Sequence, residues 1–473
     1  MLTPTLFLSV SLFLVQSPLG FVRADVQPFT AYPNDFVDPS YIAAGNFANT
    51  TGGAQESIIS WANYLSASGP WSVTNKPFAA PSGDKKDYMS WAPYWWPNCT
   101  EVGNTTELTP QQVWVTCPYV NRDGQFNPDR LTINDIGAFF NLSDAILYNA
   151  LAFSFENKSS SVYSQNIVKF VNAWFLDSTT GMNPNLNYAQ MQRGPTGQVG
   201  SHTGILDLKG FVKIVSGIIV LRERKCTDWT DAIDAQMIAW TNKYINWLET
   251  NKLGIDECAS ANNHGSFCFN QLLALKLLVN DVSGSVDAGN KFFNGIFQGQ
   301  INSTGDQPLE ASRTHPYHYR NYNLAAMITN ARLLKYADPT SNPWNMTTKA
   351  GTTIQNALDM VMTVDPDKSA EGYAVGEIWP NIAAIASTYG DPTGKYVEFL
   401  AKSFPEYADD GDFLWNQPLA GGKVTVGTGT ASSGSTLPKS TETSGSGALA
   451  DNGLGGFLVA IVAVIFVSAA GVV

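Results

Sequence analysis

Apolar residues recur every three or four positions over most of the chain, which is the period of an amphipathic helix. Three clear sets run from Tyr163 to Trp174, from Leu208 to Ile219 and from Ile233 to Leu248. The same spacing predicts further helices at residues 131–154, 266–280, 323–337, 349–363, 378–388 and 394–404. Strand-like alternation of apolar and polar residues is scarce. The pattern therefore predicts an all-α protein.

Many helices joined by long polar loops are typical of stacked helical hairpins. No repeat of fixed length is visible, so a regular solenoid is not supported. The body of the chain, residues 25–417, is long for one domain but suits a large helical ring. We therefore predict a single (α/α) toroid, an incomplete barrel of helical hairpins.

The N-terminal end has a separate pattern. Residues 2–20 are apolar and a small-residue site follows at Val22-Arg23-Ala24, which predicts a signal peptide over residues 1–24, although the usual charged start is missing. Seven Asn-X-Ser/Thr sequons follow, at Asn49, Asn98, Asn104, Asn141, Asn157, Asn302 and Asn345. A signal peptide with this many sequons indicates a secreted glycoprotein.

The C-terminal end resembles an attachment signal. Residues 418–456 are rich in Gly, Ser and Thr, which predicts a flexible linker or an O-glycosylated stalk. Small residues at 444–447, a spacer and the apolar tail 457–473 match a GPI-attachment signal. The alternative is one membrane-spanning helix, but the tail is short and no basic residue follows it. We expect an extracellular protein that meets the membrane only through a GPI anchor.

The charge balance is acidic, with 40 Asp plus Glu against 28 Lys plus Arg. This balance argues against a nucleic-acid partner. An acidic protein can still bind a polyanion through a locally basic cleft, and Lys85, Lys86, Arg313 and Arg320 could supply one. We expect the protein to act as a monomer.

Five cysteines in an oxidising compartment predict disulfides with one thiol left over. Cys99 and Cys117 bracket a loop with sequons and are expected to pair. Cys258 and Cys268 flank a polar turn, which a bridge between them would fix. Cys226 is then the odd cysteine, although a Cys226–Cys258 bridge is the alternative. No CxxC pair or HxxxH spacing is present, so neither a metal nor another cofactor is predicted.

Groups able to move protons gather in two segments. Asn262-Asn263-His264 forms a Gly-flanked turn, and the sequence RTHPYHYRNY follows at residues 313–322. Elimination in a uronic-acid polymer needs a group that neutralises the C5 carboxylate, a base for the C5 proton and an acid for the leaving oxygen. Amide, imidazole and phenol side chains can fill these roles. The two segments therefore predict a site for such chemistry.

Two other loops are candidates for substrate binding. The first, DYMSWAPYWWP at residues 87–97, is rich in aromatics that suit the apolar faces of sugar rings or, equally, a rigid core plug. The second, residues 183–204, is rich in amides that suit sugar hydroxyls or, more commonly, turns. The substrate-binding candidates from both loops and from the two catalytic segments are Tyr88, Trp91, Tyr94, Trp95, Trp96, Gln190, His202, Asn262, His318, Arg320 and Tyr322.

These segments resemble a known family. The sequences MNPNLNYAQ, NNHGSF, QPLEASRTHPYHYRNYNL and DYMSWAPYWWP are similar to the alginate-lyase-like superfamily of polysaccharide lyases, and especially to its secreted fungal-type members. The resemblance covers about residues 60–404, in the expected order. It implies an (α/α) toroid whose cleft cuts an anionic uronate polysaccharide, of alginate or glucuronan type, by β-elimination. Ser312 and Phe267-Cys268 depart from the family's usual residues and bear on substrate preference.

The resemblance also implies the catalytic group: Asn263, His264, Arg313 and Tyr319. We expect Asn263 and His264, helped by Arg313, to hold the C5 carboxylate. Tyr319 would act as base and then as acid when the proton and leaving group share a face of the sugar. His264 is the alternative base for opposite faces. A cation at Arg313 would also favour the phenolate of Tyr319.

Two other classes of protein remain open from the sequence. A glycoside hydrolase on a similar toroid would need two carboxylates across the scissile bond. Glu310, Asp256, Glu257 and Asp306 lie near the motifs, but no pair stands out. A non-catalytic cell-surface polysaccharide-binding protein would keep the aromatic loop without needing His264 or Tyr319.

Overall fold

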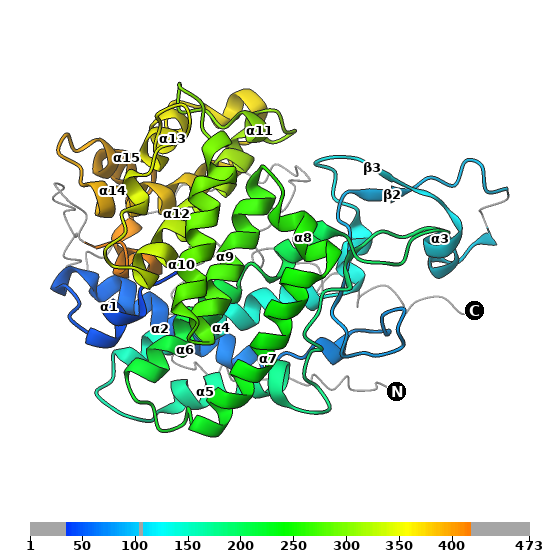
Figure 1. Ribbon diagram of the computed structural model, residues 1–473, viewed down its shortest axis with the longest axis horizontal. Coiled ribbons are helices and arrows are strands. Elements are labelled where there is room, and N and C mark those ends of the chain that lie inside the picture. The colour runs from blue at the N-terminus through cyan, green and yellow to red at the C-terminus, as the bar shows by residue number, and fades with distance from the viewer. Residues whose placement is uncertain (1–34, 104–106, 418–473) are drawn as a thin grey trace, which may run out of the picture.

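The computed structural model describes residues 35–103 and 107–417. The predicted signal peptide, linker and tail, and the sequon at Asn104, lie outside these residues. Helices dominate the described chain (Figure 1). Their bounds are α1 Pro39–Ala44, α2 Gly52–Ser68, α3 Pro110–Thr116, α4 Asp135–Ser154, α5 Val162–Val171, α6 Phe211–Glu223, α7 Asp231–Thr250, α8 Lys252–Cys258, α9 Asn263–Leu278, α10 Val282–Asn294, α11 Pro308–Ala311, α12 Pro316–Ala337, α13 Ile354–Val361, α14 Trp379–Tyr389 and α15 Lys395–Ser403. The predicted all-α class is confirmed.

An inner ring of helices forms the core. Contacts run in chain order from α2 to α4, α6, α9, α12 and α14. Almost all residues of α4, α6 and α9 are buried. These helices carry apolar residues on every side, which is typical of helices inside a core. By length and composition α4 could cross a membrane, but 83% of its apolar window is buried in the protein, so it is a core helix.

Outer helices cover this ring. Helices α5, α10, α13 and α15 each pack on the inner helix that precedes them in the chain, which makes four helical hairpins. Helix α10 shows why such helices lie outside: its buried residues Ser285, Ala288, Gly289, Phe292 and Phe293 form one stripe at helical spacing. This arrangement is the predicted (α/α) toroid.

The two ends of the described chain close the ring. Arg332 of α12 pairs with Asp35 at 2.5 Å and also donates to the side chain of Asn416. The hydroxyl of Tyr41 donates to the carbonyl of Leu414 at 3.0 Å. The contact of Tyr41 with Leu414 joins residues 373 positions apart in the sequence. The first and last described segments therefore complete one fold.

The strands are short and lie in connecting segments. Strand β1 (Met89–Trp91) pairs in parallel with β4 (Tyr188–Met191), and β2 (Trp95–Pro97) pairs antiparallel with β3 (Tyr119–Asn121). Figure 1 shows β2, β3 and α3 at one side of the helical body, opposite α14 and α15. We call residues 93–126 the hairpin segment.

The disulfides follow the first of the two expected pairings. Cys99 pairs with Cys117 within the hairpin segment, and Cys258 pairs with Cys268. Cys226 is a buried free thiol, so the alternative Cys226–Cys258 bridge is wrong. The second bridge ties the end of α8 to α9 and encloses Asn263 and His264.

The helix boundaries correct one expectation about the motifs. Asn262-Asn263-His264 was predicted as a turn, but Asn262 is the N-cap of α9 and the next two residues open the helix. The reason is tertiary: Glu310 accepts the backbone N–H of Asn263 at 2.7 Å, which satisfies a helix-end donor that a turn would leave to water. Helices α2 and α10 were not predicted, since both are rich in Gly and Ser, which weaken the helical signal.

Of the six sequon asparagines among the described residues, four are exposed and two, Asn141 and Asn302, are half-buried. The side chains of Asn49, Asn98, Asn157 and Asn345 are exposed. Asn141 instead lies on the buried helix α4, and the Ser143 of its sequon is fully buried. Its place in a buried helix makes this sequon less suited to carry a glycan than the exposed ones.

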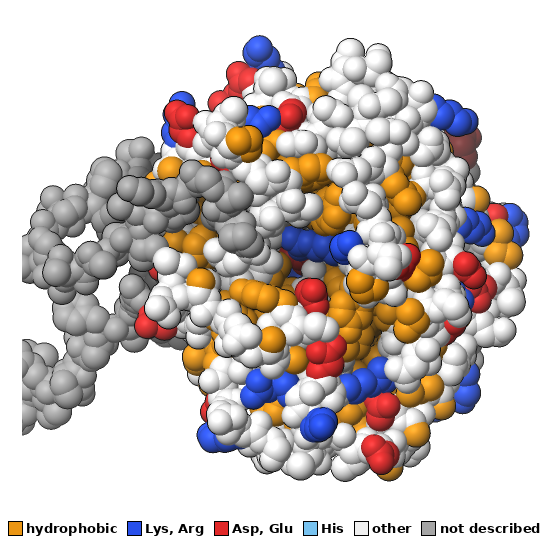
Figure 2. Space-filling view, turned by 60° about the vertical axis from the view of Figure 1, so that its left-hand side comes forward, with side chains coloured by type: hydrophobic (Ala, Val, Ile, Leu, Met, Phe, Trp, Pro, Cys, Tyr) orange, Lys and Arg blue, Asp and Glu red, His pale blue; other side chains and the backbone are white. Residues whose placement is uncertain are grey.

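One face of the molecule is shown in Figure 2. On it, basic and acidic side chains are scattered among exposed apolar ones, and the described residues form no extended basic field there.

Candidate active site

A cleft of about 680 Å³ opens where the inner helices begin. Its walls come from the first turns of α4, α9 and α12, the 3-10 helix His202–Leu208 that leads into α6, and the hairpin segment. The predicted site residues that line it are Trp91, Tyr94, Trp95, Gln190, Asn263, His264, Arg313, His318, Tyr319 and Tyr322. The structure thus brings together segments that lie more than 200 residues apart in the sequence.

Tyr319 is at the centre of a hydrogen-bonded group. Its phenol oxygen accepts a hydrogen bond from Nη2 of Arg313 at 2.8 Å and lies 3.1 Å from the hydroxyl of Tyr94. The guanidinium of Arg313 also stacks on the Tyr319 ring, 3.8 Å from its centroid. A cation in this position stabilises a phenolate more than a phenol. The geometry therefore suits Tyr319 as a proton acceptor.

Arg313 is held from behind by the hairpin segment. Asp123 accepts from its Nη2 at 2.8 Å. Burial by itself lowers the pKa of Arg313, but the hydrogen bond to Asp123 and the nearby phenol outweigh it and raise the pKa. The guanidinium therefore stays charged, and its donors are turned toward Tyr319 and Asp123.

Asn263 is anchored by a buried carboxylate. Glu310 accepts from the backbone N–H of Asn263 at 2.7 Å and from its amide nitrogen at 2.6 Å. Both side chains are about 1% exposed. Burial raises the pKa of Glu310 above its ordinary value. The amide is fixed in orientation, with one N–H of its nitrogen given to Glu310.

His264 shares a second buried carboxylate with His202. One carboxylate oxygen of Glu257 lies 2.7 Å from Nδ1 of His264, and the other lies 2.6 Å from Nδ1 of His202. Burial raises the pKa of Glu257, but the two histidines outweigh burial and lower it. The ionised Glu257 fixes Nδ1 of His264 as the bonded nitrogen, so Nε2 is left to face other partners.

The first turn of α12 is supported in the same way. Glu371 accepts the backbone N–H groups of Tyr317 and His318 at 2.9 Å each. Glu377 bonds Nδ1 of His318 at 2.8 Å. Carboxylates at a helix N-terminus are stabilised by the free N–H groups there. They fix the direction in which His318 and Tyr319 enter the cleft.

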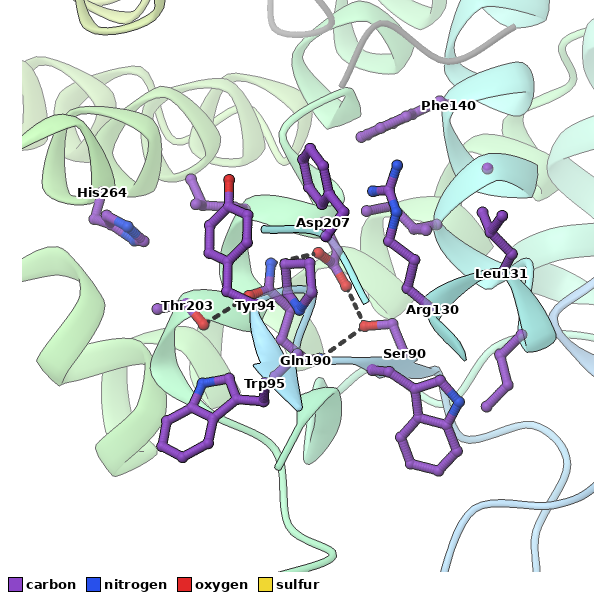
Figure 3. A pocket seen from close by; sticks show the side chains of 18 of the residues that line it. Ser90, Tyr94, Trp95, Arg130, Leu131, Phe140, Gln190, Thr203, Asp207 and His264 are labelled. Atoms are coloured by element: carbon purple, nitrogen blue, oxygen red, sulfur yellow. Dashed lines mark hydrogen bonds between the residues drawn. The ribbon is translucent and has the colours of Figure 1, made fainter. Parts of the chain in front are cut away.

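The middle of the cleft has a polar floor. Asp207 accepts from the hydroxyl of Ser90 and, at 2.9 Å, from the amide nitrogen of Gln190. Thr203 in turn donates to the amide oxygen of Gln190 at 2.7 Å. Figure 3 shows this network between His264 and Tyr94 on one side and Arg130 on the other. It gives the cleft polar groups for sugar hydroxyls.

Five predicted substrate-binding residues do not line the cleft. Tyr88 is fully buried and donates to Asp207 at 3.2 Å, so it supports the floor from below. Trp96 donates to the carbonyl of Gln125 at 2.9 Å and does not line the cleft. Arg320 pairs with Asp306. Asn262 caps α9, and His202 acts on the site through Glu257. Direct contact with substrate is not supported for these five.

Several cleft residues were missed by the sequence analysis. They are Asn121, Asp123, Phe126, Arg130, Asn134, Phe140, Asn141, Thr203, Leu206 and Asp207. Seven of these ten come from residues 121–141, a stretch that runs from β3 into α4 and carries no catalytic motif. The sequence FNPDR at residues 126–130 places an aromatic and a cation near each other, but nothing in it points to a cleft.

The carboxylates do not form the pair that a hydrolase needs. Among described residues, Asp123 and Asp207 are the carboxylates that line the cleft, and both are engaged, with Arg313 and with the floor network. Asp256 pairs with Lys252 on the surface, at 2.7 Å. Glu257 and Glu310 lie behind His264 and Asn263. These positions argue against the hydrolase alternative.

The comparisons with known proteins agree with this geometry. Residues 72–369, well over half of the chain, match the alginate lyase family. The crystal structure of an alginate lyase from Bacteroides ovatus is similar in fold, with a TM-score of 0.69 and 24% sequence identity; the match covers 80% of this chain and 97% of that chain. A search of curated protein sequences finds no match.

The fold and the cleft define a polysaccharide lyase, a carbon–oxygen lyase whose substrate is an anionic polysaccharide. The chain belongs to the alginate lyase family.

Proposed function

We propose that the protein cleaves a polymer of uronic acid, of alginate or glucuronan type, by β-elimination at the cleft around Tyr319. The observation that carries this proposal is the contact of Arg313 with the Tyr319 phenol oxygen, at 2.8 Å, in a cleft that Asn263 and His264 also line. This combination offers a base beside a cation, with an amide and an imidazole as hydrogen-bonding groups, which are the parts that the elimination needs.

In the proposed reaction Tyr319 reacts as the phenolate. Its oxygen takes the C5 proton of the sugar, and the electron pair of that C–H bond spreads into the carboxylate. The C4–O bond then breaks as the C4–C5 double bond forms. The phenol returns its proton to the leaving oxygen, which becomes the hydroxyl of the released chain. One residue can serve both steps when the proton and the leaving group lie on the same face.

Three residues would hold the carboxylate during this step. His264 can contact the carboxylate through Nε2, because Glu257 holds Nδ1, and Nε2 donates when the ring carries both protons. Asn263 retains one amide N–H beyond the one given to Glu310. Arg313 is partly neutralised by Asp123, so its main contribution is to stabilise the phenolate. For substrates whose proton lies on the opposite face, His264 is the alternative base.

A panel of uronate polymers tests the proposal. Purified protein is incubated with polymannuronate, polyguluronate and glucuronan, and the absorbance of a C4–C5 double bond conjugated to the carboxylate is followed. We expect absorbance to rise with at least one polymer. New reducing ends without absorbance would indicate a hydrolase, and binding without either product would indicate a non-catalytic protein.

We also propose that the protein is secreted and held at the cell surface by a GPI anchor. The support is the pattern of residues 1–24 and 444–473, together with the four exposed sequon asparagines. A GPI-specific phospholipase should release the mature protein from membranes. Detection of residues 457–473 in the mature protein by mass spectrometry would contradict the anchor and favour a spanning helix.

A further inference from the structure

Two histidines meet on one buried carboxylate beside the cleft. Glu257 of α8 is fully buried, and its two oxygens lie 2.6 Å from Nδ1 of His202 and 2.7 Å from Nδ1 of His264. The centroids of the two imidazole rings are 6.2 Å apart. His264 lines the cleft on the same side as Tyr94 (Figure 3), whereas His202 does not line it and 43% of its side chain is exposed. One carboxylate therefore connects an exposed imidazole with an imidazole of the proposed site.

The fold holds these three side chains in place. Helix α8 packs against both α9 and the 3-10 helix His202–Leu208. The Cys258–Cys268 bridge ties α8 to α9 directly beside Glu257. A side chain at Gly265, in the first turn of α9, would collide with the carbonyl oxygen of Ser260, so the glycine allows the chain between the two helices to approach α9 closely. The positions of the carboxylate and the two imidazoles are therefore set by tertiary structure.

The hydrogen bonds fix which nitrogen of each ring can titrate. Burial raises the pKa of Glu257, but His264 and His202 outweigh burial and lower it, so the carboxylate is ionised. An ionised carboxylate accepts hydrogen bonds and cannot donate them, so each histidine carries a proton on Nδ1. The second proton is gained and lost at Nε2. Two imidazolium ions would compete for one negative charge, so a charge on His202 makes a charge on His264 less favourable.

Few other charges act on His202. The hydrogen bond to Glu257 raises the pKa of His202 and burial opposes this, while Asp256 raises it and Lys252 lowers it. Asp256 and Lys252 pair with each other at 2.7 Å on the surface of α8, so their effects on His202 oppose each other. The carboxylate of Glu257 therefore dominates the charge balance at His202.

The charges around His264 do not depend on the residue at position 202. Glu310 lies behind the first turn of α9 and interacts with the charge of His264. The other charged or titratable residues of the cleft wall are Asp123, Arg130, Asp207, Arg313, His318 and the tyrosines Tyr94, Tyr319 and Tyr322. All of these stay in place when residue 202 is replaced. A variant at this position therefore changes the competition for Glu257 and leaves the other charges as they are.

The charge of His264 decides which of its two proposed roles it can fill. With both ring protons, Nε2 donates to the substrate carboxylate while Tyr319 takes the C5 proton. Without the second proton, Nε2 has a lone pair and can itself take the C5 proton. The C4–O bond then breaks as the C4–C5 double bond forms, and the hydroxyl of Tyr319 gives its proton to the leaving oxygen.

These two roles correspond to two kinds of uronate. Mannuronate and guluronate are epimers at C5. In a mannuronate or glucuronate chain the C5 proton and the leaving oxygen lie on the same face of the ring, and in a guluronate chain they lie on opposite faces. The doubly protonated His264 therefore suits mannuronate and glucuronate, and the neutral His264 suits guluronate.

We propose that His202, acting through Glu257, biases the cleft between the two C5 epimers of its uronate substrate. A cationic His202 favours the neutral form of His264 and cleavage at guluronate. A neutral His202 favours the doubly protonated form and cleavage at mannuronate or glucuronate. This inference rests on the proposed function, since it assigns a specificity to the same cleft. His202 is a positioning residue, which touches neither the substrate nor the reacting atoms.

Two variants that differ in charge test the coupling directly. His202→Asn keeps a neutral N–H close to the place of Nδ1, and His202→Lys supplies a permanent cation. An NMR titration of the imidazole signals follows His264, whose signal is identified by its loss in His264→Gln. We expect His264 to lose its second proton about one pH unit higher in His202→Asn than in His202→Lys, as for two partly screened charges at this separation. Equal titrations in the two variants would overturn the inference.

Lys252→Gln is the matched control for the titration. It removes a charge from the same helix, but the lysine side chain is 84% exposed and pairs with Asp256 instead of Glu257. The titration of His264 should stay in place in this variant. A shift as large as that between the two variants at position 202 would show that any nearby charge acts on His264, and would contradict a specific role for His202.

The second measurement compares the two epimers as substrates. The ratio of kcat/KM on polymannuronate to kcat/KM on polyguluronate, taken near pH 7, should be about tenfold higher in His202→Asn than in His202→Lys. The unmodified protein should resemble His202→Lys at pH values below the raised pKa of His202 and His202→Asn above it. Equal changes on both polymers would make His202 merely structural and overturn the inference.

A pH profile replaces the ratio if only one of the two polymers is cleaved. The alkaline limb of kcat/KM on polymannuronate, or the acid limb on polyguluronate, should lie at higher pH in His202→Asn than in His202→Lys. Limbs that coincide would contradict the inference. Failure of the proposed function is seen separately, as absence of double-bond absorbance with the unmodified protein on every uronate polymer. The NMR titration needs no substrate and decides the coupling of His202 to His264 in either case.

Discussion

Tyr319 occupies a position that only a few side chains could fill. Its phenol oxygen receives Arg313 and faces Tyr94, so any change in its ability to give and take a proton alters the proposed reaction directly. The ring itself packs with Phe267, Tyr322 and Ala326 in a small apolar cluster. Packing and chemistry therefore depend on different atoms of the same residue.

Tyr319→Phe removes the hydroxyl and keeps the ring. We expect kcat to fall by about a hundredfold or more, because the proton carrier is lost. Binding of an oligosaccharide, measured by calorimetry, should change little. Tyr317→Phe is the matched control, since this neighbour on α12 is buried and bonds the carbonyl of Val375 outside the cleft. Near-normal turnover in Tyr319→Phe would remove Tyr319 from the mechanism.

Arg313→Ala tests the cation beside the phenol. Without it the phenolate is less favoured, so the acid limb of the kcat/KM profile should move to higher pH and the maximal rate should fall. Arg320→Ala removes the other arginine of the motif, which pairs with Asp306 away from the cleft, and should leave the profile in place. A profile that keeps its shape in Arg313→Ala would make this arginine structural.

The sequence could predict the motif residues but not the residues that hold them. Asn263, His264, Arg313 and Tyr319 stand out because their types and spacing suit the chemistry. Their supporting carboxylates do not: Glu310 is 47 residues from Asn263, and Asp123 is 190 residues from Arg313. Contacts over such separations are set by the packing of helices, which periodicity alone does not specify.

Among the helices of the ring, too, some features could be predicted from the sequence and others depend on tertiary packing. The 3.6-residue period predicted α4, α6, α7 and α9, whose apolar positions are plentiful. It did not predict that α9 begins at Asn263, because that start depends on Glu310 from another part of the fold. The period also gave no sign that the hairpin segment reaches the site. Tyr94 was expected there only because its loop is rich in aromatics, and Asp123 was not expected there.

The junction of α8 and α9 is a pH-sensitive element. A hydrogen bond to Glu257 raises the pKa of His202. Burial raises the pKa of Glu257, but His264 and His202 outweigh burial and lower it. The contribution of His202 to the free energy of unfolding is present below its pKa of about 6.5 in the unfolded chain. It is lost as pH rises through the raised pKa of the folded state. The contribution of Glu257 to the free energy of unfolding is present above its pKa of about 4.3 in the unfolded chain. It is lost as pH falls through the lowered pKa of the folded state.

Glu257→Gln should therefore reduce stability most between about pH 4.3 and pH 6.5, where both contributions are present. Urea unfolding at several pH values measures the difference from the unmodified protein. In the variant, an NMR titration should also find the His202 imidazole losing its proton at lower pH. Glu249→Gln, which alters a more exposed ion pair with Lys276, serves as the control. A difference that is constant across pH would contradict the coupling.

The whole molecule depends on closing the ring at its ends. Arg332 and Asp35 form an ion pair whose side chains are 15% and 9% exposed, and Asn416 joins it. Removing one partner of a mostly buried pair leaves the other charge uncompensated.

Arg332→Ala should lower the free energy of unfolding by about 3 kcal/mol in urea denaturation. Lys158→Ala, at a pair that is 61% exposed on the lysine side, should change it by less than about 1 kcal/mol. Similar small effects for both would show that the two ends contribute little to the fold. Activity of the folded Arg332→Ala protein should be normal, since the cleft lies elsewhere.

The long helix α12 carries a residue of the cleft at one end and a residue of the ring closure further along. Tyr319 stands in its first turn at the cleft, and Arg332 stands 13 residues later at the ring closure, which is roughly 20 Å along the helix axis. The last described residues leave the fold at the closure end. A tether that continues from there, natural or engineered, can hold the enzyme on a solid surface with its cleft turned outward to a long polymer. The same geometry allows attachment to a bead or film through the C-terminal side without obstructing the entry of substrate.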